Sequence, residues 1–437
     1  MNLVYLHTHD SGRYLQPYGY QIPTPSLMKL AEGGTLFRQA YCAAPTCSPS
    51  RAAMLTGVNA HSSGMTGLAH RGFSLSDKSR HLASTLNRSG FETALCGVQH
   101  ETSSNPKELG YQHILTDTEA DSTNYETLDL ANTRKVLDYL KAPKEKPFFL
   151  SLGFNNTHRE YPKIKDAANP DYVMPPFPLP DCPETRKDFA AYIDSASVVD
   201  RCCGMVLEAL EKNGLMENTV VLFTTDHGIA FPKMKCNLYD TGIGVAMILK
   251  YPGNPSAGKV IDSLVSQLDV YPTLLSLLGV EKPGWLEGHD LTPILNGERE
   301  SVREEIFAEV NYHASYEPMR CIRTKRYKLI RRFDQEYPGF PFANVDDGFS
   351  KTVLLENGWQ SKKPESIQLF DLLHDPVERL NLAENPDYAS VLEDLNRRLE
   401  SWMAKTDDPL LKGRVPMPEG ARIHQRKCLS NQESEME

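Results

Sequence analysis

The sequence predicts an α/β protein with a mostly parallel central sheet flanked by helices, followed by a smaller α+β domain. Short runs rich in β-branched and aromatic residues alternate with stretches whose apolar residues recur at helical spacing. This alternation is typical of parallel strands joined by helical crossovers. Polar side chains also follow four of the predicted strands, at the strand ends where open parallel sheets gather their ligands.

The elements of the large sheet are expected before residue 300. The predicted strands are 3–8, 92–96, 148–154, 220–225 and 245–249, and the predicted helices are 26–32, 82–88 and 189–212. Asn213 and Gly214 form a stop signal for the longest helix. The polar residues that follow the strands are His9-Asp10, His100, Asn156-Thr157-His158 and Asp226-His227. These side chains are expected to share one site if the strands are neighbours.

The pattern changes near residue 300. Segments 304–310 and 320–332 are predicted as strands of an antiparallel sheet, and 388–404 as a C-terminal helix. Segment 334–363 is rich in glycine, proline and aromatic residues and is expected to be a long loop or insertion. The tail after Lys412 is polar and is expected to be poorly ordered. We therefore predict a main domain over 1–300, an antiparallel-sheet-plus-helix domain over 301–412 and a polar tail over 413–437.

Composition limits the partners. The chain has 437 residues, a formal net charge of -10 and no long basic run, so neither nucleic acid nor a membrane surface is an expected partner. No apolar stretch approaches the ~18 residues of a membrane span. The opening MNLVYLHTHD lacks the features of a signal peptide. Nine cysteines without a CxxC pair favour reduced thiols, and we expect a cytoplasmic protein.

Cys47 lies in the segment that carries the strongest chemical signal. The segment continues Cys47-Ser48-Pro49-Ser50-Arg51 and ends at Leu55-Thr56-Gly57. A proline in the first turn of a helix fixes its direction, so Cys47 is expected at the positive end of a new helix. Such an end binds anions, and Arg51 one turn later adds a permanent cation. A tetrahedral oxyanion such as sulfate or phosphate fits this position; the alternative is a buried cysteine beside a surface arginine.

The Cys-x-Pro-Ser-Arg motif, followed at this spacing by Leu-Thr-Gly, resembles the signature of the sulfatase family, in the alkaline-phosphatase-like superfamily. The resemblance extends over nearly the whole chain and implies that 1–300 is the catalytic domain. It also implies that a separate maturation enzyme oxidises Cys47 to formylglycine. One hydroxyl of the hydrated aldehyde then attacks sulfur, and the other later expels sulfate.

The resemblance implies a metal site as well. The opening strand followed by His9-Asp10 resembles the family's first metal pair, usually Asp-Asp, and Asp226-His227 resembles the second, usually Asp-Asn. The implied ligands are His9, Asp10, Cys47, Asp226 and His227. Calcium is the family's usual ion, whereas two imidazoles favour manganese, iron or zinc. A polar turn at the end of a strand is the alternative for 226–228.

Other catalytic residues are implied by sequence elements that resemble motifs of the family. Lys235 resembles the lysine that contacts sulfate, His100 ends an element similar to Gly-Lys-x-His, and His158 matches a sulfate-contacting histidine. The implied catalytic set is Cys47, Arg51, His100, His158 and Lys235. Val98 stands where the family has a lysine, which removes one cation. The alternatives are a solvated lysine at position 235 and core histidines at positions 100 and 158.

The C-terminal part resembles the N-sulfoglucosamine sulfohydrolase branch, through Asn237-Leu238-Tyr239 and Tyr316-Glu317-Pro318-Met319-Arg320. That branch removes N-sulfate from glucosamine of heparan-type sugars. Arg320, Arg323 and the aromatic loop 333–349 are expected to contact such a sugar, although the loop alternatively packs between the domains.

The sequence therefore predicts an enzyme that hydrolyses sulfate esters or N-sulfates of a sulfated sugar, with one divalent metal ion and a formylglycine derived from Cys47. The expected partners are a small or oligosaccharide sulfate and the maturation enzyme. Two other functions remain open: a phosphonate or phosphate ester hydrolase, and a non-catalytic sugar-binding relative whose Cys47 is never modified.

Overall fold

A computed structural model describes residues 1–161, 168–334 and 336–437. Its main feature is an eight-stranded sheet with the strand order β4-β3-β5-β1-β6-β7-β2-β8. The strands are β1 Asn2–Thr8, β2 Thr35–Tyr41, β3 Glu92–Gly97, β4 His113–Ile114, β5 Phe148–Gly153, β6 Thr219–Thr225, β7 Met247–Lys250 and β8 Lys259–Ser266. β7 pairs antiparallel with β6 and β2, while the other neighbours run parallel. The predicted fold class is confirmed.

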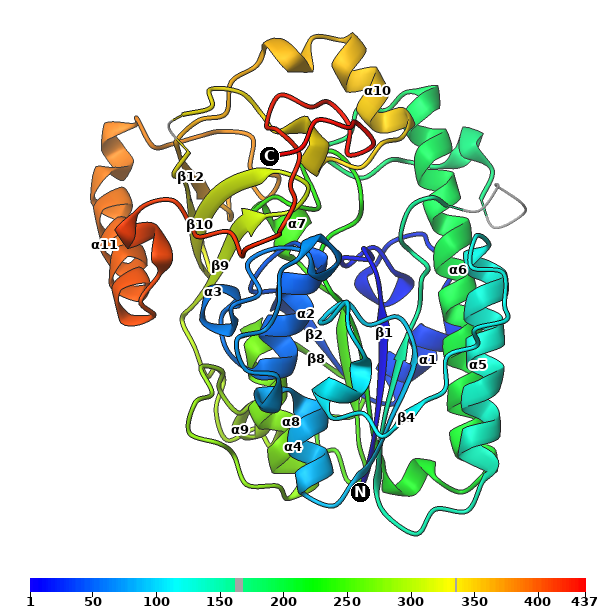
Figure 1. The fold of residues 1–437 in the computed structure, drawn as a ribbon. Helices are drawn as coiled ribbons and strands as arrows, with labels where there is room; N and C mark the ends of the chain where they lie inside the picture. Colours follow the sequence, from blue (N-terminus) through cyan, green and yellow to red (C-terminus); the bar gives the residue numbers. More distant parts are fainter. Residues whose placement is uncertain (162–167, 335) are drawn as a thin grey trace.

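Helices cover both faces of this sheet, and the alternation along β1 shows why. Leu3 and Tyr5 join a core that contains residues of α2, α4 and α8, whereas Val4 and Leu6 join a core with α1, α5 and α6. Successive side chains of a strand point to opposite faces, so a strand with apolar residues on both faces requires cover on both sides. The helices are α1 Pro25–Glu32, α2 Cys47–Thr56, α4 Leu82–Arg88, α5 Tyr125–Lys141, α6 Pro183–Lys212 and α8 Val270–Leu278. Figure 1 shows α5 and α6 side by side along one flank.

A four-stranded antiparallel sheet, of order β12-β11-β10-β9, lies C-terminal to the large sheet. Its strands are β9 Glu305–Tyr312, β10 Tyr316–Thr324, β11 Tyr327–Arg332 and β12 Ile367–Asp371. One of its faces packs on α11 Ala389–Lys405 through Leu395 and Leu399. Residues of β9 and β10 also join the apolar core beside α2, so the two sheets share a core. The antiparallel sheet and the C-terminal helix were both predicted.

Two expectations about the C-terminal half need correction. Segment 334–363 is not entirely loop, since it contains the helix α10 Phe349–Glu356. The helix begins directly after Gly348, where apolar residues recur along the chain. The residues of this segment are described apart from position 335. The tail is packed: Ile423 and Cys428 are buried, and His424 forms a β-bridge with Met436. Its few apolar side chains suffice to anchor a segment that is polar on average.

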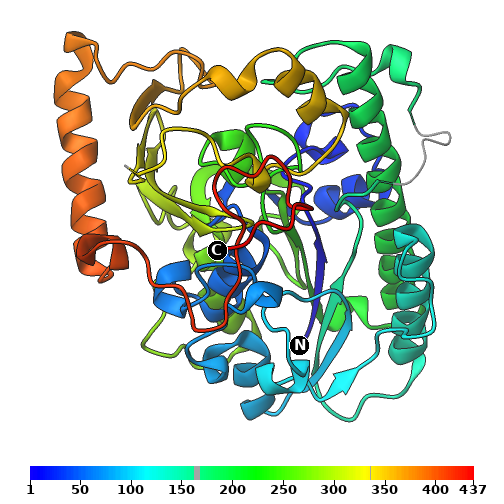
Figure 2. The same cartoon turned by 45° about the horizontal axis from the view of Figure 1, so that its top comes forward.

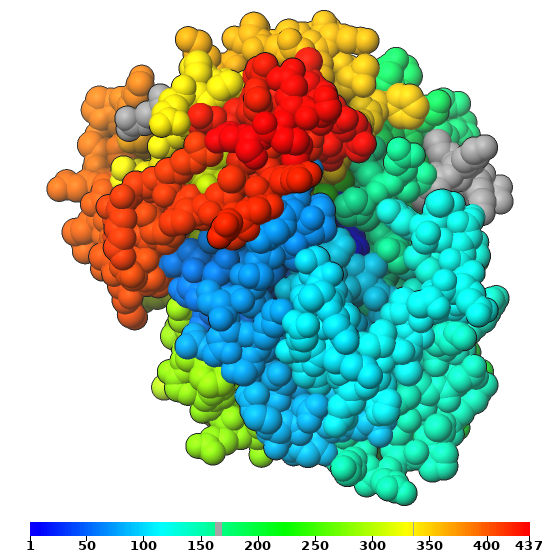
Figure 3. Space-filling model, viewed as in Figure 1, coloured from blue at the N-terminus to red at the C-terminus, as the bar shows by residue number. Residues whose placement is uncertain are grey.

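The tail lies over the strand ends. The backbone N–H of Arg422 donates to the carbonyl of Arg71, and that of Ala343 donates to the carbonyl of Cys428. In Figures 2 and 3 the red tail crosses the surface between the blue segment that includes α2 and the gold segment that includes α10. None of the helices in the described parts of the chain has the length and apolar character of a membrane span.

Candidate active site

The site is built at the ends of two adjacent strands. β1 and β6 pair in parallel, with Thr8 opposite Thr225, so His9-Asp10 and Asp226-His227 leave the sheet side by side. Asp10 adopts the left-handed backbone conformation, with φ 42°, and its N–H donates to Asp226 Oδ1 over 2.8 Å. A left-handed conformation is costly for a residue with a side chain and is retained where the surroundings enforce it. The turn therefore directs the Asp10 side chain toward the neighbouring strand.

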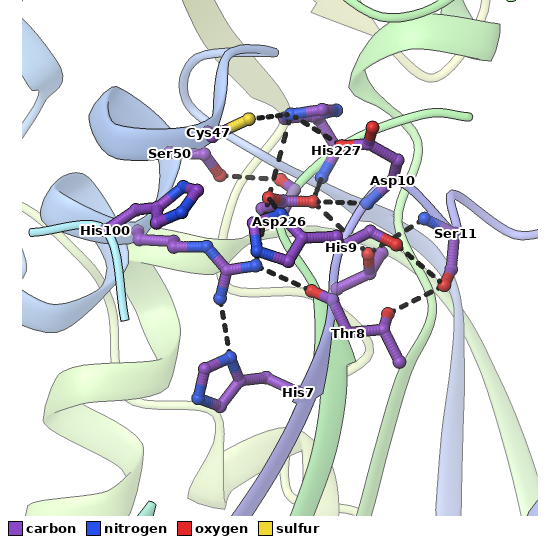
Figure 4. Close-up of polar contacts among 12 residues, drawn as sticks. His7, Thr8, His9, Asp10, Ser11, Cys47, Ser50, His100, Asp226 and His227 are labelled. Atoms are coloured by element: carbon purple, nitrogen blue, oxygen red, sulfur yellow. Dashed lines mark hydrogen bonds and ion pairs between the residues drawn. The ribbon is translucent and has the colours of Figure 1, made fainter. Parts of the chain in front are cut away.

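Four possible metal donors converge there. One ligand atom each from His9, Asp10, Cys47 and Asp226 lies within 4.8 Å of the others, and all four residues are buried. The imidazole Nε2 of His227 lies 3.4 Å from Asp10 Oδ1 and 3.7 Å from Asp226 Oδ2. Figure 4 shows these side chains pointing toward one another from β1, β6 and α2. A second grouping joins His9, Cys47 and His100.

Unpartnered atoms mark the same place. Asp10 Oδ1 and His9 Nδ1 are buried and form no hydrogen bond among the described residues; they lie 3.4 Å from His227 Nε2 and from Asp226 Oδ2, respectively. Leaving a carboxylate oxygen unsatisfied in the interior is expensive, because it loses its hydration without compensation. A divalent cation would satisfy both atoms, so the donor set fits the metal that the sequence implied.

Asp226 is held in its ionised form. Burial alone would raise the pKa of this carboxyl, but His227, Arg51 and His9 together lower it well below its usual value. The Arg51 guanidinium donates from Nη2 to Asp226 Oδ2 over 3.0 Å and to the Thr8 carbonyl over 2.8 Å. Its Nη1 contacts His7 Nδ1. Arg51 thus lies enclosed beneath the carboxylate, a position that the motif alone did not reveal.

Cys47 is the first residue of α2, as the sequence predicted. Its Sγ lies 3.4 Å from His227 Nε2. Ser50 Oγ donates to the Asp226 carbonyl over 2.6 Å and so fixes the start of α2 against the end of β6. Burial raises the pKa of the Cys47 thiol, although Lys235 opposes the shift. Burial by the protein alone therefore favours the neutral thiol of an unmodified cysteine.

Lys235 is a buried cation between two carboxylates. Its Nζ lies 2.9 Å from Asp10 Oδ2 and 3.0 Å from Asp346 Oδ2. Burial alone would lower the pKa of this amine, yet Asp10 and Asp346 raise it well above its usual value. The solvated-lysine alternative for Lys235 is wrong.

Asp346 and the buried His313 were missed by the sequence analysis. Burial would raise the pKa of Asp346, but Lys235, His158 and His313 lower it. The Asp346-Asp347-Gly348 turn gave a weak signal, because a pair of acids in a glycine-rich loop is common at surfaces. Both residues enter the site only because the loops of the small sheet fold over the large one.

Two of the predicted histidines lie beside His9. The His100 ring centroid is 4.7 Å from that of His9, and the His158 centroid is 5.2 Å from it. Burial, assisted by Arg51, lowers the pKa of His100 to about 3, so this imidazole is neutral at neutral pH and a weak base. His158 Nδ1 faces the carbonyl of Arg159. The structure therefore brings together every catalytic and metal residue expected from the sequence.

Two arginines expected to contact a sugar do not line the site. Arg320 is fully buried and pairs with Asp408 through Nε at 2.6 Å and Nη2 at 2.8 Å. Arg323 pairs with Asp240 at 3.1 Å. Both side chains turn into the shared core of the two sheets, where their charges are already neutralised. The expectation that they bind substrate anions was wrong.

Comparisons with known proteins show which families and structures the chain resembles. The family model described as Sulfatase matches residues 2–280, and that described as N-sulphoglucosamine sulphohydrolase, C-terminal, matches 228–340. The chain is 30% identical to human N-sulphoglucosamine sulphohydrolase, covering 93% of this chain and 91% of the relative. It is 27% identical to an ulvan-active sulfatase of Formosa agariphila, covering 93% and 75%. The phosphonate monoester hydrolase of Agrobacterium radiobacter shares the fold, with TM-score 0.71 and 19% identity over 96% and 98% of the chains.

Proposed function

The chain belongs to the sulfatase family, whose members hydrolyse sulfate esters and N-sulfates, and we propose that it does so with a formylglycine made from Cys47. The observation that carries this proposal is the position of Cys47. It lies at the positive end of α2 and within 4.8 Å of three donor side chains. A helix N-terminus beside a charged cluster is where a tetrahedral oxyanion would be held.

The release step supports a modified cysteine. An unmodified Cys47 has no second hydroxyl that could expel the sulfate, and burial by the protein alone also favours its neutral thiol. Oxidation by a maturation enzyme supplies both hydroxyls of the hydrated aldehyde, which attacks through oxygen. One hydroxyl forms the bond to sulfur as the sugar oxygen or nitrogen leaves. Loss of the proton from the second hydroxyl then re-forms the aldehyde and expels sulfate.

We further propose that His9, Asp10, Asp226 and His227 hold one divalent metal ion together with the modified Cys47. The metal would supply positive charge to the sulfate oxygens and favour ionisation of the attacking hydroxyl. Calcium is the ion expected from the family. The two imidazoles shift the preference toward manganese, iron or zinc.

The remaining residues act around this centre in our proposal. Arg51 keeps Asp226 ionised and adds positive charge beneath the transferring group, and Lys235 contacts a sulfate oxygen. His100 is proposed for proton transfer with the nucleophile or the leaving group, which requires the negative charge of a bound sulfate to raise its low pKa. His158 contacts the sulfate or shares the proton transfer. Because Val98 replaces the family lysine, leaving-group protonation depends on these histidines.

The substrate is proposed to be an N-sulfated glucosamine of a heparan-type sugar. The supporting observation is the match of 228–340 to the C-terminal model of the N-sulphoglucosamine sulphohydrolases. The test is a panel of glucosamine N-sulfate, 6-O-sulfated N-acetylglucosamine and an aryl sulfate at equal concentrations. Hydrolysis of an O-sulfate ester with the N-sulfate untouched would overturn the substrate while leaving the sulfatase assignment intact.

A phosphonate or phosphate ester hydrolase is the second candidate. The histidine-rich donor set and Val98 favour it, and the fold is shared with a phosphonate monoester hydrolase. Sulfate and phosphonate esters of one phenol, assayed side by side, separate the two. If the phosphonate ester is hydrolysed faster than the sulfate ester, the chain is a phosphonate or phosphate ester hydrolase.

The third candidate, a non-catalytic sugar-binding relative, is tested by mass. Trypsin releases residues 39–51, which contain both Cys42 and Cys47. Alkylation labels both thiols in an unmodified chain and only Cys42 in a chain that carries formylglycine. Two labels on protein isolated from its own cells would support the binding role.

We also propose a cytoplasmic location and three functional parts. All nine cysteines are free thiols, as a reducing compartment requires. Residues 1–300 would act as the catalytic domain, residues 301–412 as the domain that closes the site, and residues 413–437 as a tail that covers it.

A further inference from the structure

A cavity lies beside the loop that carries Lys235. Its volume is about 490 Å³, and it is formed by the loop after β6 together with the segments before and after α10. None of the residues proposed for catalysis or metal binding lines it. A volume in this range suits a sugar-sized ligand.

Unpaired cations surround this cavity. Lys233, Lys362, Lys363 and Arg379 line it, and none of them forms an ion pair with a described carboxylate. All four residues are exposed. Partial burial lowers the pKa of Lys233, and the charges of Lys362 and Arg379 lower it further. These side chains therefore lie close enough to repel one another, an arrangement that an anion would stabilise.

The acidic residues of the cavity do not neutralise this charge. Glu317 is paired with Arg332, and Glu378 lies 2.8 Å from Lys328 Nζ. Glu365 accepts a hydrogen bond from Gln368 and is the remaining carboxylate of the lining. Four cations against one free carboxylate make the cavity strongly positive on a chain whose net charge is -10.

One wall is suited to a sugar ring. Phe340 and Trp359 line the cavity, with ring centroids 6.2 Å apart; Phe340 is partly exposed, whereas Trp359 is buried and packs edge-on against Phe342 at 4.9 Å. Aromatic faces bind the apolar faces of sugars, while amide groups such as that of Asn237 pair with hydroxyls. The aromatic loop expected to contact a sugar therefore contributes here, away from Cys47.

The same two loops build this cavity and the active site. Lys233 precedes Lys235 by two residues, so their Cα atoms are at most ~7.6 Å apart. Asn344 and Val345 of the cavity directly precede Asp346, the partner of Lys235. Lys235 is turned inward to Asp10, while Lys233 faces the cavity.

We propose that this cavity binds a second anionic sugar unit of the oligosaccharide whose sulfate is held at Cys47. The inference rests on the proposed function, because it assigns the sulfate-bearing unit to the site beside Cys47. The ligand is a sulfated or carboxylated sugar ring that stacks on the aromatic wall and pairs with the unpaired cations. Oligosaccharides should consequently bind more tightly than single sugars.

The test uses the full chain with Cys47→Ala, so that no turnover occurs. Binding of a heparin-derived tetrasaccharide and of glucosamine N-sulfate is measured by calorimetry, with and without Lys362→Ala and Arg379→Ala together. Lys233 is left unchanged, because its φ of 62° makes a replacement there a backbone perturbation near Lys235. The matched control removes two exposed lysines, Lys141 and Lys212, at the ends of α5 and α6.

The double variant should weaken tetrasaccharide binding roughly tenfold, reduce its salt dependence and leave the monosaccharide affinity unchanged. Tetrasaccharide binding as tight as in the control, or an equal loss for the monosaccharide, would overturn the proposal. A wild-type chain that hydrolyses no sulfate would overturn the proposed function instead. The binding experiment still reports on the cavity in that case.

Discussion

The buried Lys235 forms an ion pair with the partly buried Asp346, in which the ammonium lies 3.0 Å from a carboxylate oxygen. The pair joins the loop after β6 to the segment that follows β11, and the same ammonium lies 2.9 Å from Asp10. The cation of the active site is therefore positioned by carboxylates from both sheets. A segment that follows a strand of the small sheet therefore contributes a carboxylate to the site.

The first prediction follows from this pair. Asp346→Asn should lower kcat/KM for any sulfate substrate by roughly 10- to 100-fold, because Lys235 loses one of two fixed partners and shifts from its position. The fall in the lysine's pKa should appear as an earlier loss of activity at high pH. Asp347→Asn is the control, since Asp347 is half-exposed and pairs with Lys351. Equal activities of the two variants would contradict the role of Asp346.

The second prediction concerns Cys47. Cys47→Ala should abolish turnover without changing the circular dichroism spectrum or the melting temperature appreciably, because the side chain faces the donor cluster and not the apolar core. Cys47→Ser should fare nearly as badly, since a serine lacks the second hydroxyl that expels sulfate. Cys42→Ala, at another buried cysteine, should keep its activity. Turnover by Cys47→Ala would falsify the assignment of the nucleophile.

The third prediction concerns the metal. Asp226→Asn should lower metal content, measured by elemental analysis of the purified protein, because the variant loses one anionic donor. Chelation of the wild type should stop activity, and add-back of calcium and manganese in separate samples identifies the ion that restores it. Glu101→Gln is a useful control, since Glu101 is also buried but is not among the grouped donors. A chelated protein with full activity and no bound ion would show that the cluster serves another purpose.

The sequence predicted the large sheet where its strands are buried on both faces. The edge strand β8 was missed, because its first residues Lys259 and Val260 are exposed and its apolar residues do not form a continuous run. β2 was missed for a related reason: Arg38 and Gln39 interrupt it. α5 was missed because much of its surface faces solvent and its apolar stripe is narrow.

The residues of the active site were also predicted only in part. His9, Asp10, Asp226 and His227 were found because parallel strands end at one edge, so chain position alone places them together. Asp346 could not be found in this way, since it follows no strand of the large sheet. The burial of Arg51, Arg320 and Arg323 was also hidden, because each depends on a carboxylate partner distant in sequence.

The last prediction concerns stability and the contact between the two sheets. His61 in α3 Ala60–Ser63 donates from its backbone N–H to Glu309 Oε1 over 3.0 Å, and its Nδ1 lies 2.8 Å from the same atom. Burial would raise the pKa of Glu309, but His61 and Arg320 lower it to about 2. Burial would lower the pKa of His61, but Glu309 raises it above 6.5.

The two shifts define a pH window. Because the folded pKa of Glu309 is depressed, its contribution is complete above the unfolded value of 4.5 and is lost as pH falls toward 2. Because the folded pKa of His61 is raised, its contribution is complete below the unfolded value of 6.5 and is lost as pH rises through the folded pKa. The pair should therefore stabilise the fold most between about pH 4.5 and 6.5.

His61→Gln should cost about 3 kcal/mol of unfolding free energy at pH 5.5, because it leaves a buried carboxylate with a weaker partner. The cost should shrink at pH 9, because the wild-type histidine loses its charge as the pH rises through its raised pKa. Urea unfolding at the two pH values measures the difference, with His113→Gln as the control, since His113 is exposed and lies 3.9 Å from Glu92. A cost that is the same at both pH values would mean that the pair acts through packing against Trp402 and not through charge.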